Sequence, residues 1–117
     1  MNTPNDPQSQ LPLTEATYFI LLSLAPGSRH GYAIMKDVYL LSHERVVLST
    51  GTLYTALKRL LDQGWIRRAD EPDAGTNGRQ RKAYHITDLG RRILEVEVQR
   101  LEGLVGAAQL RILRGAP

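Results

Sequence analysis

The sequence predicts a mainly α-helical fold with a small two-stranded β wing, that is, a winged helix-turn-helix followed by a long C-terminal helix. Three observations support this prediction. Three helical segments with apolar faces follow one another over residues 13–63. Two short strands flank a loop rich in Gly, Asp and Asn within residues 65–86, and an apolar heptad pattern runs through residues 87–117.

The length and composition are those of one small globular domain with an accessory helix. The chain has 117 residues, of which 42% are hydrophobic and 23% are charged, as in an ordinary folded protein. We expect a flexible N-terminal tail at residues 1–11, a winged-helix domain at 12–86 and a C-terminal dimerisation helix at 87–117. No apolar run reaches the roughly 18 residues of a membrane span and no secretory signal pattern is seen, so we expect a cytoplasmic protein without a membrane partner.

Caps and apolar spacing predict the first two helices. Thr14 is a suitable N-cap for a helix over residues 13–25, because its hydroxyl can accept a hydrogen bond from the first turn. Pro26 and Gly27 end that helix. A second helix with one apolar face is predicted over residues 30–41.

The third predicted helix begins after Ser49, an N-cap candidate, and ends at Gln63 before the helix-terminating Gly64. Leucines at helical spacing form its buried face: Leu53, Leu57, Leu60 and Leu61. The polar residues between them are therefore expected to point outward.

Two wing strands are predicted at residues 65–68 and 81–86. Alternation in the second strand places Tyr84 and Ile86 inward, and Ala83 and His85 outward. The loop between the strands reads as a hairpin tip with three basic residues on its return side: Arg79, Arg81 and Lys82.

The last helix is predicted to begin after its cap at Thr87 and to extend to about Leu113. Its apolar residues are spaced 4, 3, 4, 3 and 4, as in the a/d seam of a coiled coil, and they are Leu94, Val98, Leu101, Val105, Ala108 and Ile112. The seam could pack on the chain's own first helix. A domain this small gains little from a lone extended helix, however, so we favour a second copy of the chain as the partner.

Charge and residue types narrow the classes of function. The net charge is +3, and from Arg29 to Arg92 there are twelve Lys and Arg residues against seven Asp and Glu, which favours a nucleic-acid partner for the middle of the chain. The chain has no cysteine, so disulfides and thiolate metal sites are excluded. The three histidines lack metal-ligand spacing, and no metal or cofactor is expected.

In a winged helix the third helix enters the major groove of double-stranded DNA, and its N-terminal half contacts base edges. Small residues at 49–55 keep this half slim, so its backbone N–H groups can approach a phosphate. Basic residues further along the helix and on the wing can contact the DNA backbone. The predicted DNA-binding residues are Ser49, Thr50, Gly51, Thr52, Tyr54, Thr55, Lys58, Arg59, Arg79, Arg81 and Lys82.

Three ordered motifs resemble those of the PadR family of transcriptional regulators. They lie at residues 29–34 (RHGYAI), 49–60 (STGTLYTALKRL) and 81–90 (RKAYHITDLG). The resemblance implies a winged-helix DNA-binding domain, a homodimer formed through the C-terminal helix, and repression that a small-molecule effector or a stress signal relieves. Many relatives carry Pro where Thr50 and Thr55 stand, so helix entry and one groove contact are expected to differ here. The single C-terminal helix resembles the shorter branch of the family and leaves little room for a dedicated ligand pocket.

Several alternatives remain open at the level of sequence. Tyr54 could pack on the hairpin rather than contact a phosphate, and Lys58 and Arg59 could form a solvated helix face. The whole domain could instead be a winged-helix protein-interaction adaptor without specific DNA binding. An enzyme is not expected, because the sequence shows no nucleophile-base pair, paired carboxylates or phosphate-binding glycine loop.

Overall fold

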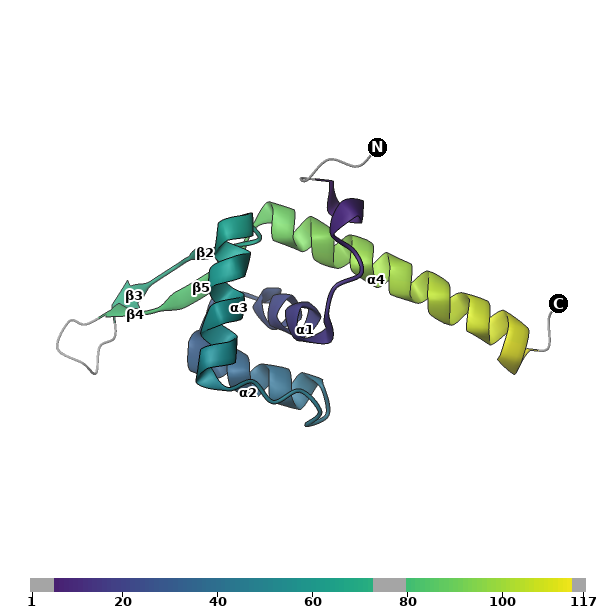
Figure 1. Cartoon of the computed structure of the whole chain (residues 1–117), viewed down its shortest axis with the longest axis horizontal. Coiled ribbons are helices and arrows are strands. Elements are labelled where there is room, and N and C mark those ends of the chain that lie inside the picture. The colour runs from purple at the N-terminus through teal and green to yellow at the C-terminus, as the bar shows by residue number, and fades with distance from the viewer. Residues whose placement is uncertain (1–5, 73–79, 115–117) are drawn as a thin grey trace.

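The computed structural model describes residues 6–72 and 80–114 and has the predicted winged helix-turn-helix architecture (Figure 1). Helices α1, α2 and α3 pack together, a small antiparallel sheet lies beside them, and the long helix α4 projects away from the domain (Figure 1). The helices are η1 (Pro7–Gln10), α1 (Glu15–Leu24), α2 (Gly31–Leu41), α3 (Thr50–Gln63), α4 (Asp88–Ala108) and the π-helical η2 (Gln109–Leu113). The strands are β1 (Arg29–His30), β2 (Ile66–Arg68), β3 (Glu71–Pro72), β4 (Gln80–Arg81) and β5 (Ala83–Ile86).

The helix caps formed as the sequence predicts. The Thr14 hydroxyl accepts a hydrogen bond from the Thr17 N–H at 3.2 Å, and the Thr87 hydroxyl accepts one from the Gly90 N–H at 3.1 Å. Gly64 ends α3 with a φ of 77°, a left-handed conformation that glycine adopts without a steric penalty. These local signals fix where α1, α3 and α4 begin and where α3 turns into the wing.

The sheet has three strands rather than the two that the sequence predicts, in the order β1-β5-β2. Strand β1 was missed because it has only two residues, and its pairing with β5, Arg29 opposite Tyr84, is what makes it a strand. Since β5 is therefore the middle strand, Ala83 is buried, and the prediction that it points outward is wrong. Tyr84 and Ile86 are buried as predicted.

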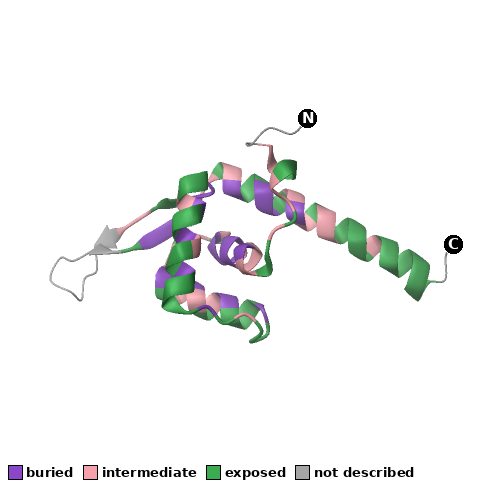
Figure 2. Cartoon of the chain, viewed as in Figure 1, coloured by how far each residue is buried: buried purple, intermediate pink, exposed green. Residues whose placement is uncertain are grey.

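The core lies where α1 meets the other helices and the sheet. Ile20, Leu21 and Leu24 of α1 are completely buried, and they pack in one cluster with Leu53 and Leu57 of α3. This arrangement explains why α1 is apolar on most sides, since other elements surround it (Figure 2). The core thus holds the buried face of α3 and leaves its other face free.

The segment before α1 is not wholly the flexible tail that the sequence predicts. Residues 7–10 form η1, whose N-cap Asp6 accepts a hydrogen bond from the Gln8 N–H, and η1 lies against α4. The Leu13 N–H donates to Glu97 Oε2 at 2.9 Å. This contact joins residues 84 positions apart, so composition alone gave no sign of it.

The Glu97 carboxylate links α4 to the segment before α1, and this link depends on pH. Its side chain is 2% exposed, and Arg100 donates to both of its carboxylate oxygens, at 2.5 and 3.1 Å. The hydrogen bonds from Arg100 and then from the Leu13 N–H outweigh burial and hold the pKa of the Glu97 carboxyl below its ordinary value of 4.5. The folded state therefore favours the ionised form.

We predict that Glu97→Gln flattens the loss of stability in acid. In the wild type, the stabilisation is fully present above pH 4.5 and is lost as the pH falls through the lowered pKa of the folded state, because the unfolded chain then binds more protons. Urea unfolding of the wild type and of Glu97→Gln at several pH values between neutrality and acid measures the difference. Glu95→Gln, an exposed residue of the same helix, is the control and should follow the wild type.

Helix α4 changes character along its length. Its first half is covered by the domain, whereas its second half is exposed and extends beyond the other helices (Figure 2). Leu94 is 5% exposed and belongs to the chain's own core, so the prediction that it starts the dimer seam is wrong. The π-helical turn of η2 adds a residue to the last turn, so Ile112 departs from the predicted register.

Within the described part of the chain, no helix is long and apolar enough to cross a lipid bilayer.

Candidate nucleic-acid interface

The polar face of α3 is open to solvent along its first three turns. All eight residues predicted for this helix face are exposed: Ser49, Thr50, Gly51, Thr52, Tyr54, Thr55, Lys58 and Arg59. The opposite face is held in the core by Leu53, Leu57 and Leu60. The structure therefore leaves these eight residues on the exposed surface of a helix whose leucine face is packed in the core (Figure 2).

The start of α3 is narrow and its first hydroxyls are paired with each other. The Ser49 hydroxyl accepts from the Thr52 N–H at 3.1 Å and donates to the Thr52 hydroxyl at 2.9 Å. A Cβ placed on Gly51 would have no neighbour within 4 Å. A flat or grooved ligand surface can thus approach the first turn of α3 closely.

Tyr54 packs against the start of α2 and also lies near the hairpin. A Cβ placed on Gly31, the first residue of α2, would lie 2.5 Å from the Tyr54 hydroxyl oxygen. Burial is the main cause that raises the pKa of the Tyr84 phenol, and the nearby Tyr54 is the second cause. Tyr54 therefore also lies close to strand β5. Tyr54 therefore connects α3 to the start of α2 and keeps part of its ring exposed.

Lys58 and Arg59 are neighbours in the sequence, but their side chains make different contacts. Lys58 is highly exposed and its Nζ lies 3.3 Å from an Asp62 carboxylate oxygen, a surface pair that contributes little to stability. Arg59 instead donates to the hydroxyl of the buried Thr17 in α1 at 2.8 Å. Arg59 thus joins α3 to α1 while it is still exposed, and its contact with DNA stays a prediction.

An ion pair that the sequence analysis missed fixes the base of the wing. The Arg68 guanidinium donates to both carboxylate oxygens of Asp70 and lies 5.7 Å from the centroid of the Tyr84 ring. Asp70 also accepts from the Ala83 N–H at 3.0 Å. The hydrogen bond from Arg68 holds the pKa of the Asp70 carboxyl below its ordinary value. The spacing of a basic and an acidic residue two positions apart at a strand end was the available signal.

Only part of the predicted wing contact can be placed. Lys82 is exposed and lies directly before β5 on the return side of the hairpin. Arg79 lies outside the described residues, as does the side chain of Arg81. Among the residues that the structure describes, no group of three His, Asp or Glu side chains could hold a metal ion.

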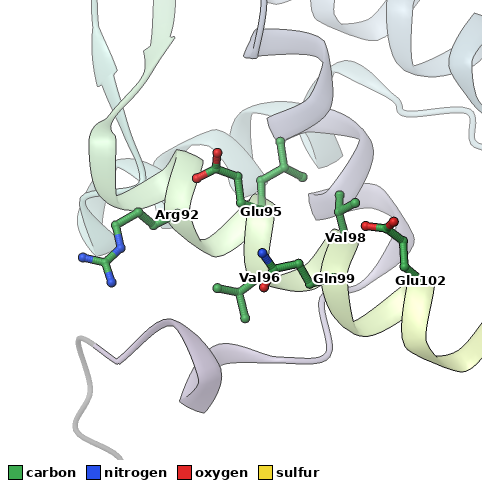
Figure 3. A pocket seen from close by; sticks show the side chains of 7 residues that line it. Arg92, Glu95, Val96, Val98, Gln99 and Glu102 are labelled. Carbon is green, nitrogen blue, oxygen red and sulfur yellow. The ribbon is translucent and has the colours of Figure 1, made fainter.

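Two hollows meet on α4. One, of about 470 Å³, is lined only by residues of this helix (Figure 3): Arg92, Leu94, Glu95, Val96, Val98, Gln99 and Glu102. The other, of about 390 Å³, lies between α1 and α4, with Tyr18 on the α1 side and Leu101 and Val105 on the α4 side. Val98 and Glu102 line both. The two hollows thus occupy the side of α4 that carries the middle of the predicted seam.

The part of the chain that holds α2, α3 and the wing also identifies the family. Residues 20–96 match the PadR-like family of transcriptional regulators. The chain belongs to this family. The match includes every predicted DNA-binding residue and ends before the exposed half of α4.

Solved PadR-family structures share the fold. A PadR family transcription regulator from Clostridium difficile R20291 is 25% identical with a TM-score of 0.68, over 82% of this chain and 96% of that one. A PadR-like regulator from Bacillus cereus is 27% identical with a TM-score of 0.66, over 83% and 89%. Bacillus subtilis PadR, solved in complex with operator DNA, is 25% identical with a TM-score of 0.64, over 74% and 48%.

A sequence relative is longer than this PadR-family chain. An uncharacterized 37.1 kDa protein in transposon TN4556 of Streptomyces fradiae is 37% identical over 92 residues. That stretch is 79% of this chain but only 24% of the relative. The chain therefore spans about a quarter of the length of the curated relative that it matches.

Proposed function

We propose that this PadR-family chain is a homodimeric repressor that binds an inverted-repeat operator in double-stranded DNA and blocks a promoter. The exposed face of α3 carries the proposal, because a narrow helix start rich in hydroxyls is exposed to solvent while the opposite face of the helix packs in the core. The major groove admits one such helix. Such a regulator acts where the DNA lies, so the proposal places it in the cytoplasm.

The roles of the DNA-facing residues follow from their position. Thr52 and Thr55 lie on the exposed face of α3, where a hydroxyl or methyl group can contact base edges. Lys58 is the exposed cation of the same face, and its weak surface pair with Asp62 gives way readily to a phosphate. Lys82 would bind the backbone from the wing. Support by analogy comes from Bacillus subtilis PadR, which was solved with operator DNA.

Dimerisation is proposed through the second half of α4. Five large apolar residues of this half and of the following η2 are at least half exposed: Leu104, Val105, Leu110, Ile112 and Leu113. Large exposed apolar side chains on a projecting helix favour association. A second copy related by two-fold symmetry would cover the seam from Val98 to Ala108 and close the two hollows on α4. A small-molecule effector, if bound, would fit in the hollow between α1 and α4, next to Tyr18.

We expect Thr52→Ala and Lys58→Gln to weaken DNA binding in different ways. Thr52→Ala should lose about 1 kcal/mol or more of preference for the bound sequence over random DNA. Lys58→Gln should weaken binding to all sequences and lower the slope of log K against log salt by about one. Fluorescence anisotropy with labelled duplexes across a salt series measures both effects.

A charge-matched control and a rival function complete this experiment. Arg114→Gln removes the same charge from an exposed position beyond the seam and should leave binding close to that of the wild type. A protein-interaction adaptor predicts the same DNA affinity for wild type, Thr52→Ala and Lys58→Gln. A flat salt response of the wild type, or no preference over random DNA, would contradict the proposal.

A further inference from the structure

The first motif, residues 29–34, holds mainly structural residues. Arg29 donates through Nε to the Ser23 carbonyl oxygen at 2.7 Å and lies 3.7 Å from an Asp37 carboxylate oxygen. Gly31 leaves room for the Tyr54 hydroxyl. Ile34 is completely buried in the core. Each of these residues is explained by the packing of the domain itself.

Tyr32 is the exception in this motif, because it has no place in the core. Its side chain is 67% exposed, far more than that of Tyr54. The ammonium of Lys36, one helical turn further along α2, lies 5.6 Å from the centroid of the Tyr32 ring. This is within the range of a cation–π contact, so the two exposed side chains form one polar unit on α2.

The Tyr32–Lys36 pair lies beside the candidate DNA-binding face of α3. Gly31 precedes Tyr32 directly and is in near-contact with Tyr54 of that face, so the first turn of α2 adjoins the first half of α3. The start of α2 lies next to α3, and the end of α2 points away from it (Figure 1). In helix-turn-helix proteins, the helix before the recognition helix crosses the phosphate backbone.

We propose that Tyr32 and Lys36 form a phosphate-binding pair on α2, in addition to the contacts of α3 and the wing. The inference rests on the proposed DNA-binding function. The phenol O–H of Tyr32 donates to a phosphate oxygen, and the Lys36 ammonium supplies the opposite charge. Their contact with each other holds both groups on the same side of the helix. Such a pair strengthens binding and sets the position of α3 without reading the sequence.

A different use of this face is a protein-docking patch. Tyr39 and Leu40, later in α2, are also exposed and apolar. Phosphate binding is favoured for Tyr32 because its neighbours are Lys36 and the α3 face, whereas Tyr39 lies two turns away. Tyr39 therefore provides a matched control on the same helix.

Two conservative variants of the full chain test the pair. Tyr32→Phe keeps the ring and removes only the hydroxyl, and we expect duplex binding to weaken about fivefold to tenfold. Lys36→Gln should lower the slope of log K against log salt by about one. Both effects should be equal for a random-sequence duplex and for duplexes selected by the wild type. Tyr39→Phe and Arg114→Gln are the controls and should bind like the wild type.

The outcomes separate this inference from the proposed function. If the wild type binds DNA and both variants keep its affinity and salt slope, the phosphate pair is wrong and the proposed function stands. An effect restricted to the selected duplexes would also overturn it, because that indicates base readout. If the wild type binds no duplex at all, the proposed function fails and this inference with it. Circular dichroism of each variant checks that the fold is kept, as expected for exposed side chains.

Discussion

Gly90→Ala is expected to destabilise the fold by about 3 kcal/mol, as overpacking against rigid backbone does. A Cβ on Gly90 would overlap the carbonyl oxygen of Trp65 and come within 3.0 Å of the Ile86 side chain. The Trp65 carbonyl cannot move easily, because it accepts a hydrogen bond from the Thr87 N–H at 3.0 Å. Gly90 is therefore the point where α4 joins the wing.

The comparison for Gly90→Ala is Gly51→Ala, at a helical glycine with open space around it. This change should be neutral or stabilise the protein by less than about 1 kcal/mol. Urea unfolding of both variants at one fixed protein concentration measures the free energies, since association would otherwise alter them. Equal stability of the two variants would contradict the close packing of α4 on the Trp65 turn.

Val105→Glu is expected to convert the proposed dimer to a monomer and to weaken binding to a two-half-site operator by about a hundredfold or more. Val105 lies on the seam of α4 and is 55% exposed in the single chain. Two-fold symmetry brings the seams together, so two carboxylates would face each other in an apolar contact. Without the dimer, each half-site is bound independently, and the gain from linked binding is lost.

Ala107→Glu is the matched control for the dimer. It adds the same charge to the same exposed half of α4, but at a position off the seam. Analytical ultracentrifugation over a range of concentrations gives the mass of each variant. A dimeric Val105→Glu, or a wild type that is monomeric at all concentrations, would show that this seam does not join two chains.

Signals that act within a few residues made much of the fold predictable from the sequence. The caps Thr14, Ser49 and Thr87 each accept a hydrogen bond from a backbone N–H three residues later. The group that starts each helix is therefore its neighbour in the sequence. The leucine spacing of α3 likewise fixed which of its faces is buried, and with it most of the candidate DNA surface. The family motifs lie on these same elements.

What the sequence did not predict concerns contacts between distant segments. The hydrogen bond of Arg59 to Thr17 joins residues 42 positions apart. Ala83 seemed exposed because β1, its neighbour in the sheet, is too short to recognise. Leu94 fits the heptad spacing as well as Val98 does, but the domain already covers it. Periodicity shows which face of an element is apolar and does not show which molecule covers that face.

The wing contains both features that local sequence predicts and contacts that it does not predict. Its strands and the inward Tyr84 follow from alternation, whereas the Arg68–Asp70 pair and its bond to the Ala83 N–H depend on how the two strands align. Charged residues near a strand end are usually solvated, so the two-residue spacing of Arg68 and Asp70 is a weak signal on its own. The pair now explains how the strands β2 and β5 are joined at the base of the wing.

The central claim, that a dimer presents two α3 helices to DNA, is tested most directly by selecting duplexes from a random library with the wild-type protein. The proposal predicts enrichment of an inverted repeat whose half-sites are centred about one helical turn, roughly 10 base pairs, or a multiple of it apart. Enrichment of a single unrepeated site, or of no sequence at all, would contradict it.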